Sequence, residues 1–205
     1  MRNREQTTIS YQQGFTLMEI VIAIGIFAGV VFIIGMFIKS VFDYQLLFTQ
    51  QLSAQQEIEQ TFGMMLPEMR SMVPSVIGGY AIMQASSTSL TFFTDLDANG
   101  SADQVRYFLD GTTLRKGIIR PSGNPPIYDA AQEVISDVAH SVVPGTPIFS
   151  YYDAQYTGSE PALTEPIQLS DIRLIGVTLS LRDPNKAVPV TAHIEIVPRN
   201  LRTNL

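Results

Sequence analysis

The longest apolar stretch of the chain lies near its N-terminus, from Ile20 to Ile38. No side chain in this stretch carries a charge, an amide or a hydroxyl group. Because a helix rises about 1.5 Å per residue, a segment of about 20 residues crosses a hydrocarbon core about 30 Å thick. Only a helix or a closed barrel satisfies its backbone there, and one segment cannot close a barrel. We therefore predict a transmembrane helix whose membrane part covers residues 15–38.

A different periodicity follows the span, over residues 39–73. Apolar side chains recur there at helical spacing beside a glutamine-rich polar face. They are Phe48, Leu52, Ile58, Phe62, Met65, Met69 and Met72. The pattern predicts that the helix continues outside the membrane to about Ser71, and that its apolar stripe packs on another part of the chain.

From Pro74 onward, apolar and polar residues alternate, which is typical of half-buried strands. The predicted strands cover residues 76–84, 89–94, 103–109, 114–120, 148–152, 172–182 and 190–197. Asp110-Gly111 predicts a tight hairpin turn, whereas residues 130–143 carry no clear pattern. The expected fold class is α+β, with a long N-terminal transmembrane helix packed on a mostly antiparallel β-sheet domain over residues 74–205.

The residues before the span differ from those of an ordinary anchor. A polar, weakly basic leader, MRNREQTTISYQQ, precedes Gly14 and predicts a cytoplasmic N-terminus with the later residues outside. Glu19 lies at the upstream edge of the apolar run, where a carboxylate facing lipid is costly. A secretory signal peptide is the competing interpretation. It fits poorly, because the apolar run is long and no small-residue cleavage site follows it.

The six residues Gly14-Phe15-Thr16-Leu17-Met18-Glu19 resemble the prepilin cleavage and methylation motif of type IV pilins and type II secretion pseudopilins. The resemblance implies a pilin-like fold and a leader peptide, residues 1–14, that a prepilin peptidase removes between Gly14 and Phe15. It also implies N-methylation of Phe15 and a role of Glu19 in filament assembly. The β-rich part resembles the larger minor subunits, of the minor pilin W or pseudopilin J type.

Physical chemistry gives Glu19 an assembly role independently of the resemblance. Cleavage would create a cationic amine at Phe15 near the membrane, and a carboxylate on a neighbouring subunit would neutralise it. The alternative is that Glu19 lies at the level of the lipid headgroups and snorkels towards water.

One segment of the β-rich part has the spacing of a metal site, Asp95-Leu-Asp-Ala-Asn-Gly-Ser-Ala-Asp103. Oxygen ligands at alternate positions followed by glycine match the first half of a calcium loop. The candidate calcium ligands are the side chains of Asp95, Asp97, Asn99 and Asp103 and the main-chain carbonyl of Ser101. The EF-hand's twelfth-position glutamate is replaced by Arg106, and an ordinary hairpin loop uses the same residue types. A calcium ion bound here would have a structural role.

Composition narrows the function classes. The net charge of −6 argues against nonspecific nucleic-acid binding, which needs a basic surface. The chain has no cysteine, so it cannot be stabilised by disulfides. His140 and His193 are far apart in sequence, and neither a nucleophile elbow nor a phosphate-binding loop occurs. We therefore expect no enzyme.

These observations predict a minor pilin or pseudopilin that assembles into a type IV pilus-like filament. A minor pseudopilin of type II secretion is the closest alternative, and a single-pass membrane-anchored, calcium-dependent binding protein belongs to another class. The expected partners are other pilins or pseudopilins, the prepilin peptidase, the inner-membrane assembly platform and membrane lipid. The expected location is the bacterial inner membrane, with the C-terminal domain extracytoplasmic, and then a cell-surface or periplasmic filament.

Overall fold

The computed structural model describes residues 14–182 and 188–201, with the backbone alone described over residues 43–52. The chain divides into two compact units, Met1–Thr49 and Gln50–Leu205. The predicted leader, apart from Gly14, lies outside the described residues.

One long helix, α1 (Leu17–Arg70), has 54 residues and confirms the predicted continuous helix. Pro67 lies inside its last turn, where the missing N–H removes a single helical hydrogen bond. Ser71 follows the helix, and its hydroxyl donates to the carbonyls of Pro67 (2.8 Å) and Glu68 (3.2 Å). The side chain of Ser71 therefore satisfies carbonyl groups that the end of a helix leaves exposed.

The described residues form two antiparallel sheets, with strand orders β1-β2-β3-β4-β5 and β6-β7-β8. The first contains β1 (Ile82–Ala85), β2 (Ser89–Thr94), β3 (Asp103–Asp110), β4 (Thr113–Ile119) and β5 (Val134–Ala139). The second contains β6 (Phe149–Tyr152), β7 (Leu174–Leu181) and β8 (Val190–Ile196). Short 3₁₀ helices cover Ala130–Gln132, Leu169–Asp171 and Arg199–Leu201. The α+β class with antiparallel sheets is confirmed.

Two strand predictions need correction. Residues 76–81, predicted as part of a strand, form a turn instead, because Gly78 has φ 81° and the Ser75 hydroxyl accepts a hydrogen bond from the Gly79 N–H (2.7 Å). The strand β5 was not predicted. It lies at the edge of its sheet with mostly exposed side chains, so it shows no alternation of buried and exposed residues. The predicted hairpin is confirmed, since Asp110 pairs with Thr113 across a two-residue loop.

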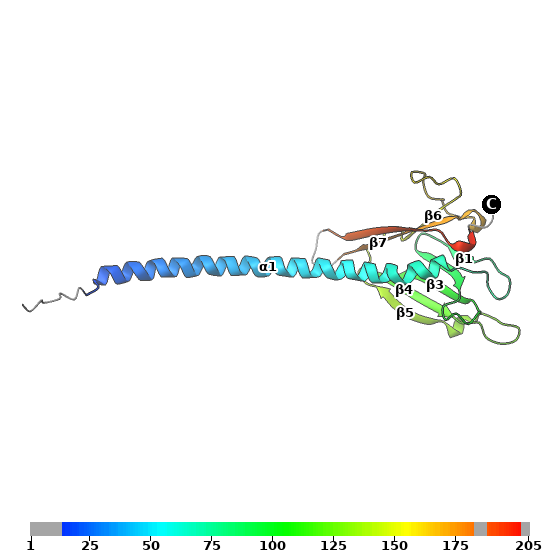
Figure 1. Ribbon diagram of the computed structural model, residues 1–205, viewed down its shortest axis with the longest axis horizontal. Coiled ribbons are helices and arrows are strands. Elements are labelled where there is room, and N and C mark those ends of the chain that lie inside the picture. Colours follow the sequence, from blue (N-terminus) through cyan, green and yellow to red (C-terminus); the bar gives the residue numbers. More distant parts are fainter. Residues whose placement is uncertain (1–13, 183–187, 202–205) are drawn as a thin grey trace, which may run out of the picture. The chain divides into compact units, whose positions relative to one another are not determined.

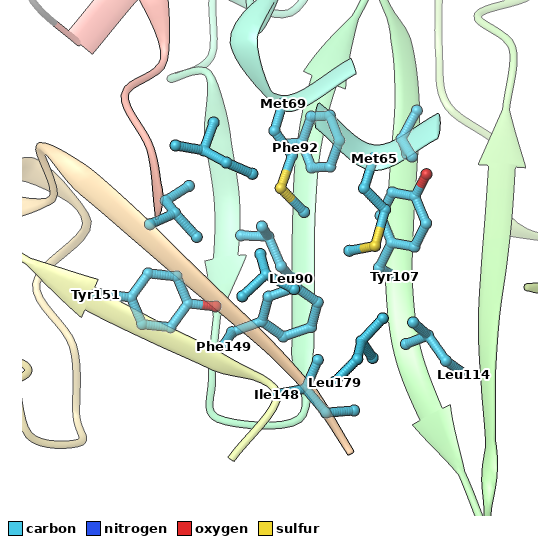
Figure 2. Close-up of a cluster of buried hydrophobic side chains, with 14 of the residues drawn as sticks. Met65, Met69, Leu90, Phe92, Tyr107, Leu114, Ile148, Phe149, Tyr151 and Leu179 are labelled. Carbon is cyan, nitrogen blue, oxygen red and sulfur yellow. The ribbon is translucent and has the colours of Figure 1, made fainter. Parts of the chain in front are cut away.

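Side chains of α1 and of both sheets meet in one hydrophobic core. In Figure 2, Met65 and Met69 lie beside Phe92 and Tyr107, and Phe149 lies among the side chains from the second sheet. The predicted apolar stripe of the helix is thus a packing face: Ile58, Met65, Met69 and Met72 are buried and Phe62 is partly buried. The side chains of Phe48 and Leu52 lie outside the described residues. Within the second unit, the labelled strands β3, β4 and β5 lie along the last turns of α1 (Figure 1). Glu68 accepts hydrogen bonds from β3 and β4, and the Thr61 hydroxyl donates one to the Val138 carbonyl of β5.

Candidate functional site

The start of α1 is closed by a reciprocal pair of side chains, Thr16 and Glu19. The Glu19 carboxylate accepts hydrogen bonds from the Thr16 N–H and the Thr16 hydroxyl, both at 3.0 Å. The Thr16 hydroxyl oxygen in turn accepts a hydrogen bond from the Glu19 N–H at 3.4 Å. This is a capping box, which satisfies N–H groups that the first turn of a helix leaves without partners. Glu19 therefore has hydrogen-bond partners within its own chain.

The helix surface after the capping box is apolar and exposed. Within α1, residues Leu17–Phe42 form a segment that is long and apolar enough to cross a membrane. Phe15 is 85% exposed, and Gly14 before it is equally open, since a Cβ at that position would meet no atom within 4 Å. A groove along this face is lined by Phe15, Glu19, Ile20, Ala23, Ile24 and Phe27. Glu19 is thus the charged residue among the apolar side chains that line this groove.

The predicted calcium residues lie in the loop between β2 and β3. The two carboxylate oxygens of Asp95 accept hydrogen bonds from the N–H groups of Asn99 (3.1 Å) and Gly100 (2.8 Å). The side-chain oxygen of Asn99 accepts one from the Ser101 N–H (2.8 Å). Gly100 has φ 85°, a conformation that glycine adopts without strain. Backbone N–H groups of the loop therefore donate to the side chains of Asp95 and Asn99, while Asp97 is exposed.

Asp103 lies at the base of this loop and is 1% exposed. Its Oδ2 atom is buried without a hydrogen-bond partner among the described residues. Burial raises the pKa of Asp103, and the nearby charges of Asp97 and Asp95 raise it further, whereas the Leu96 N–H and Arg120 oppose the shift. Asp103 is therefore a buried carboxylate close to two others.

The two histidines do not form a joint site. The His140 Nδ1 atom lies 3.0 Å from Glu57 and its Nε2 atom 3.8 Å from Asp137. His193, on β8, pairs instead with the Thr178 hydroxyl at 2.9 Å. Across residues 14–182 and 188–201, no three histidine or carboxylate side chains converge closely enough to hold a metal ion. The calcium site in the β2–β3 loop stays a prediction.

A buried polar cluster, formed by Glu68, Tyr107 and Lys116, was not predicted from the sequence. Glu68 on α1 accepts hydrogen bonds from the Lys116 ammonium on β4 (2.5 Å) and from the Tyr107 hydroxyl on β3 (2.7 Å). The side chains of Lys116 and Glu68 are 7% and 14% exposed. Burial raises the pKa of Tyr107 strongly, and the Glu68 carboxylate adds to the shift. The sequence does contain a sign of this cluster. Lys116 lies two residues after Leu114 in a strand, so its side chain points to the same face as that apolar residue.

The fold defines a class, an α+β protein whose described residues include one apolar helix long enough to span a membrane. Comparison with models of known protein families gives no match, and a search among curated proteins gives none either. The function is therefore inferred from the residues of the chain itself.

Proposed function

We propose that this chain is a minor pilin or pseudopilin, a subunit of a type IV pilus-like filament. The observation that carries the proposal is the segment Gly14–Glu19 placed directly at the start of an exposed apolar helix. A cleavage site needs an open backbone, and the peptide between Gly14 and Phe15 lies before the first helical residue, Leu17. In this proposal the prepilin peptidase does the chemistry and the chain is its substrate.

Glu19 has two roles in the proposed mature subunit. Its hydrogen bonds to Thr16 fix the first turn of α1, and its negative charge remains available to a cation. The amine created at Phe15 by cleavage is such a cation, and Phe15 lines the same groove as Glu19. Between two subunits packed in lipid, pairing of this amine with the carboxylate lowers the cost of burying both charges.

The rest of the molecule suits association rather than catalysis. The apolar part of α1 offers a packing surface to the corresponding helices of other pilins or pseudopilins. The sheets of the second unit form a separate folded body that meets neighbouring subunits outside the membrane. Before assembly, the helix holds the chain in the bacterial inner membrane, where the peptidase and the assembly platform act on it.

The N-terminus of the chain after co-expression with a prepilin peptidase tests the proposal. We expect mass spectrometry to find a chain that begins at N-methylated Phe15. Gly14→Val should abolish this cleavage, whereas Gly63→Val should not. The two glycines make a matched pair, because a Cβ at either position meets no atom within 4 Å. An intact N-terminus in the wild-type chain with an active peptidase would refute the proposal.

A single-pass anchored binding protein is the second candidate, and the buried, unpartnered oxygen of Asp103 is the observation that favours it. Such a protein would keep its leader and would not enter filaments. The same mass measurement separates the two candidates, since they predict different first residues.

A further inference from the structure

The β2–β3 loop brings several oxygen atoms around one buried carboxylate. Strand residues Thr94 and Asp103 pair across the base of the loop. Three residues of the loop act electrostatically on the Asp103 carboxylate: the Leu96 N–H and the carboxylates of Asp95 and Asp97. The Oδ2 atom is left without a partner at a position that is 1% exposed. A buried oxygen atom without a hydrogen-bond partner costs about 1–3 kcal/mol, so binding of a ligand to it would be favourable.

The groups packed around the loop do not supply that partner. The Tyr128 hydroxyl could in principle donate a hydrogen bond to a carboxylate. It donates instead to the Ala102 carbonyl at 2.8 Å and accepts from the Val76 N–H at 3.3 Å. Arg120 acts on Asp103 through its charge alone, without a hydrogen bond among the described residues. Asp95 and Asp97 place further negative charge near Asp103, which favours a cation as the ligand of this oxygen atom.

We propose that Asp95, Asp97, Asn99 and Asp103 bind one calcium ion, with the main-chain carbonyl of Ser101 as a further ligand. The hydrogen bonds within the loop leave capacity for this ion. A carboxylate offers about four lone-pair positions, and Asp95 uses two of them for the N–H groups of Asn99 and Gly100. The amide oxygen of Asn99 uses one of its two lone pairs.

Binding requires one movement. No three carboxylates of the described chain already stand at coordination distance, so an exposed side chain must turn inward. Asp97 is exposed at the rim of the loop and is the residue that closes the site. Calcium fits such a site better than magnesium, because calcium accepts six to eight oxygen ligands in flexible geometry whereas magnesium demands a near-ideal octahedron.

Calorimetric titration of the full chain in detergent micelles with CaCl₂ tests the site. We expect one ion per chain with a Kd of about 10⁻⁴–10⁻³ M, as in extracellular calcium modules. Asp97→Asn should weaken binding at least tenfold without affecting the fold, because this side chain is exposed. Asp153→Asn is the matched control: Asp153 also accepts a backbone hydrogen bond in a turn, from the Gln155 N–H, but lies outside the loop.

Thermal unfolding gives a second readout. At a calcium concentration of about 100 times Kd, the midpoint of the wild-type chain should rise by about 5 to 11 °C relative to a chelator. Asp103→Asn should remove this rise. Without calcium its midpoint should equal or exceed that of the wild type, because a buried neutral amide costs less than a buried carboxylate.

Three results would overturn the proposal: no saturable calcium binding by the wild type, unchanged binding by Asp97→Asn, or equal affinity for magnesium. If Asp103→Asn fails to fold, the titration of the exposed Asp97 variant decides alone. The calcium site goes beyond the proposed function, since a chain with an intact leader would bind the ion equally well.

Discussion

Removing one member of the buried cluster of Glu68, Tyr107 and Lys116 should cost more stability than removing one partner of an exposed ion pair of the second unit. We consider the variant Glu68→Leu, which fills the space of the side chain but removes its charge. The Lys116 ammonium, 7% exposed, then has no counter-charge, and the Tyr107 hydroxyl loses its acceptor. Removing one partner of a buried ion pair costs about 3–5 kcal/mol. In a folded unit of this size, that loss corresponds to a midpoint lower by about 6–20 °C.

Replacing all three residues of the cluster tests whether the cost of Glu68→Leu comes from leaving Lys116 and Tyr107 buried without a partner. In the triple variant Glu68→Leu/Tyr107→Phe/Lys116→Met no polar group of the cluster remains buried. Apolar replacement of a complete buried ion pair is often neutral or stabilising. We therefore expect the triple variant to be more stable than Glu68→Leu, with a midpoint close to that of the wild type.

The assay is thermal or urea unfolding of the full chain in detergent micelles, followed by near-UV circular dichroism, which reports on the tyrosines of the second unit. Arg115→Ala is the control, because Arg115 forms exposed ion pairs with Asp110 and Asp137. It should cost no more than about 1 kcal/mol. The reasoning would be wrong if Glu68→Leu were as mild as the control, or if the three substitutions were additive.

Two further predictions concern the sheets. A Cβ at Gly117 would lie 2.0 Å from Glu133 Oε1, so Gly117→Ala should displace Glu133 from its two hydrogen bonds with Arg106 (2.9 and 2.6 Å). The cost is about 1 kcal/mol, and urea unfolding should show no additional loss when Glu133→Ala is combined with it. Burial raises the pKa of Tyr107 and Tyr151 above the ordinary value of 10. Their contribution to stability is therefore complete below pH 10 and is lost as the pH rises beyond it, so the unfolding midpoint should fall between pH 10 and 12. A constant midpoint over that range would contradict the burial of these hydroxyl groups.

The helix and most strands could be predicted because their patterns repeat over many residues. The apolar stripe of α1 places Ile58, Met65 and Met69 on one face, and all three are buried. The turn at Gly78 was missed because local chemistry, a serine hydroxyl and a glycine with positive φ, prevailed over the apolar residues around it. The edge strand β5 was missed for the opposite reason. Its pairing with β4 is a long-range contact, and its exposed side chains leave no periodic trace in the sequence.

The candidate sites at Glu19 and in the β2–β3 loop could be proposed from the sequence because their residues lie within nine positions of one another. The hydrogen bonds between Thr16 and Glu19 were not predicted, and the calcium site stays a prediction. The Glu68 cluster joins α1, β3 and β4, and nothing in the sequence around Glu68 indicates which strands face it.

The carboxylates of Glu19, Glu68 and Asp103 differ in where their hydrogen-bond partners lie along the chain. Glu19 accepts two hydrogen bonds from Thr16, both at its Oε2 atom, within the first turn of α1. Glu68 accepts hydrogen bonds at both of its carboxylate oxygens from residues of β3 and β4. Asp103 is more buried than Glu68, yet one of its oxygen atoms has no partner in the described chain. In a chain that has no cysteine, each buried acid that finds a cation ties two segments together in place of a disulfide. Glu68 does this with Lys116, which belongs to the protein. Asp103 has no such partner among the described residues, and in the proposed calcium site its cation comes from solution.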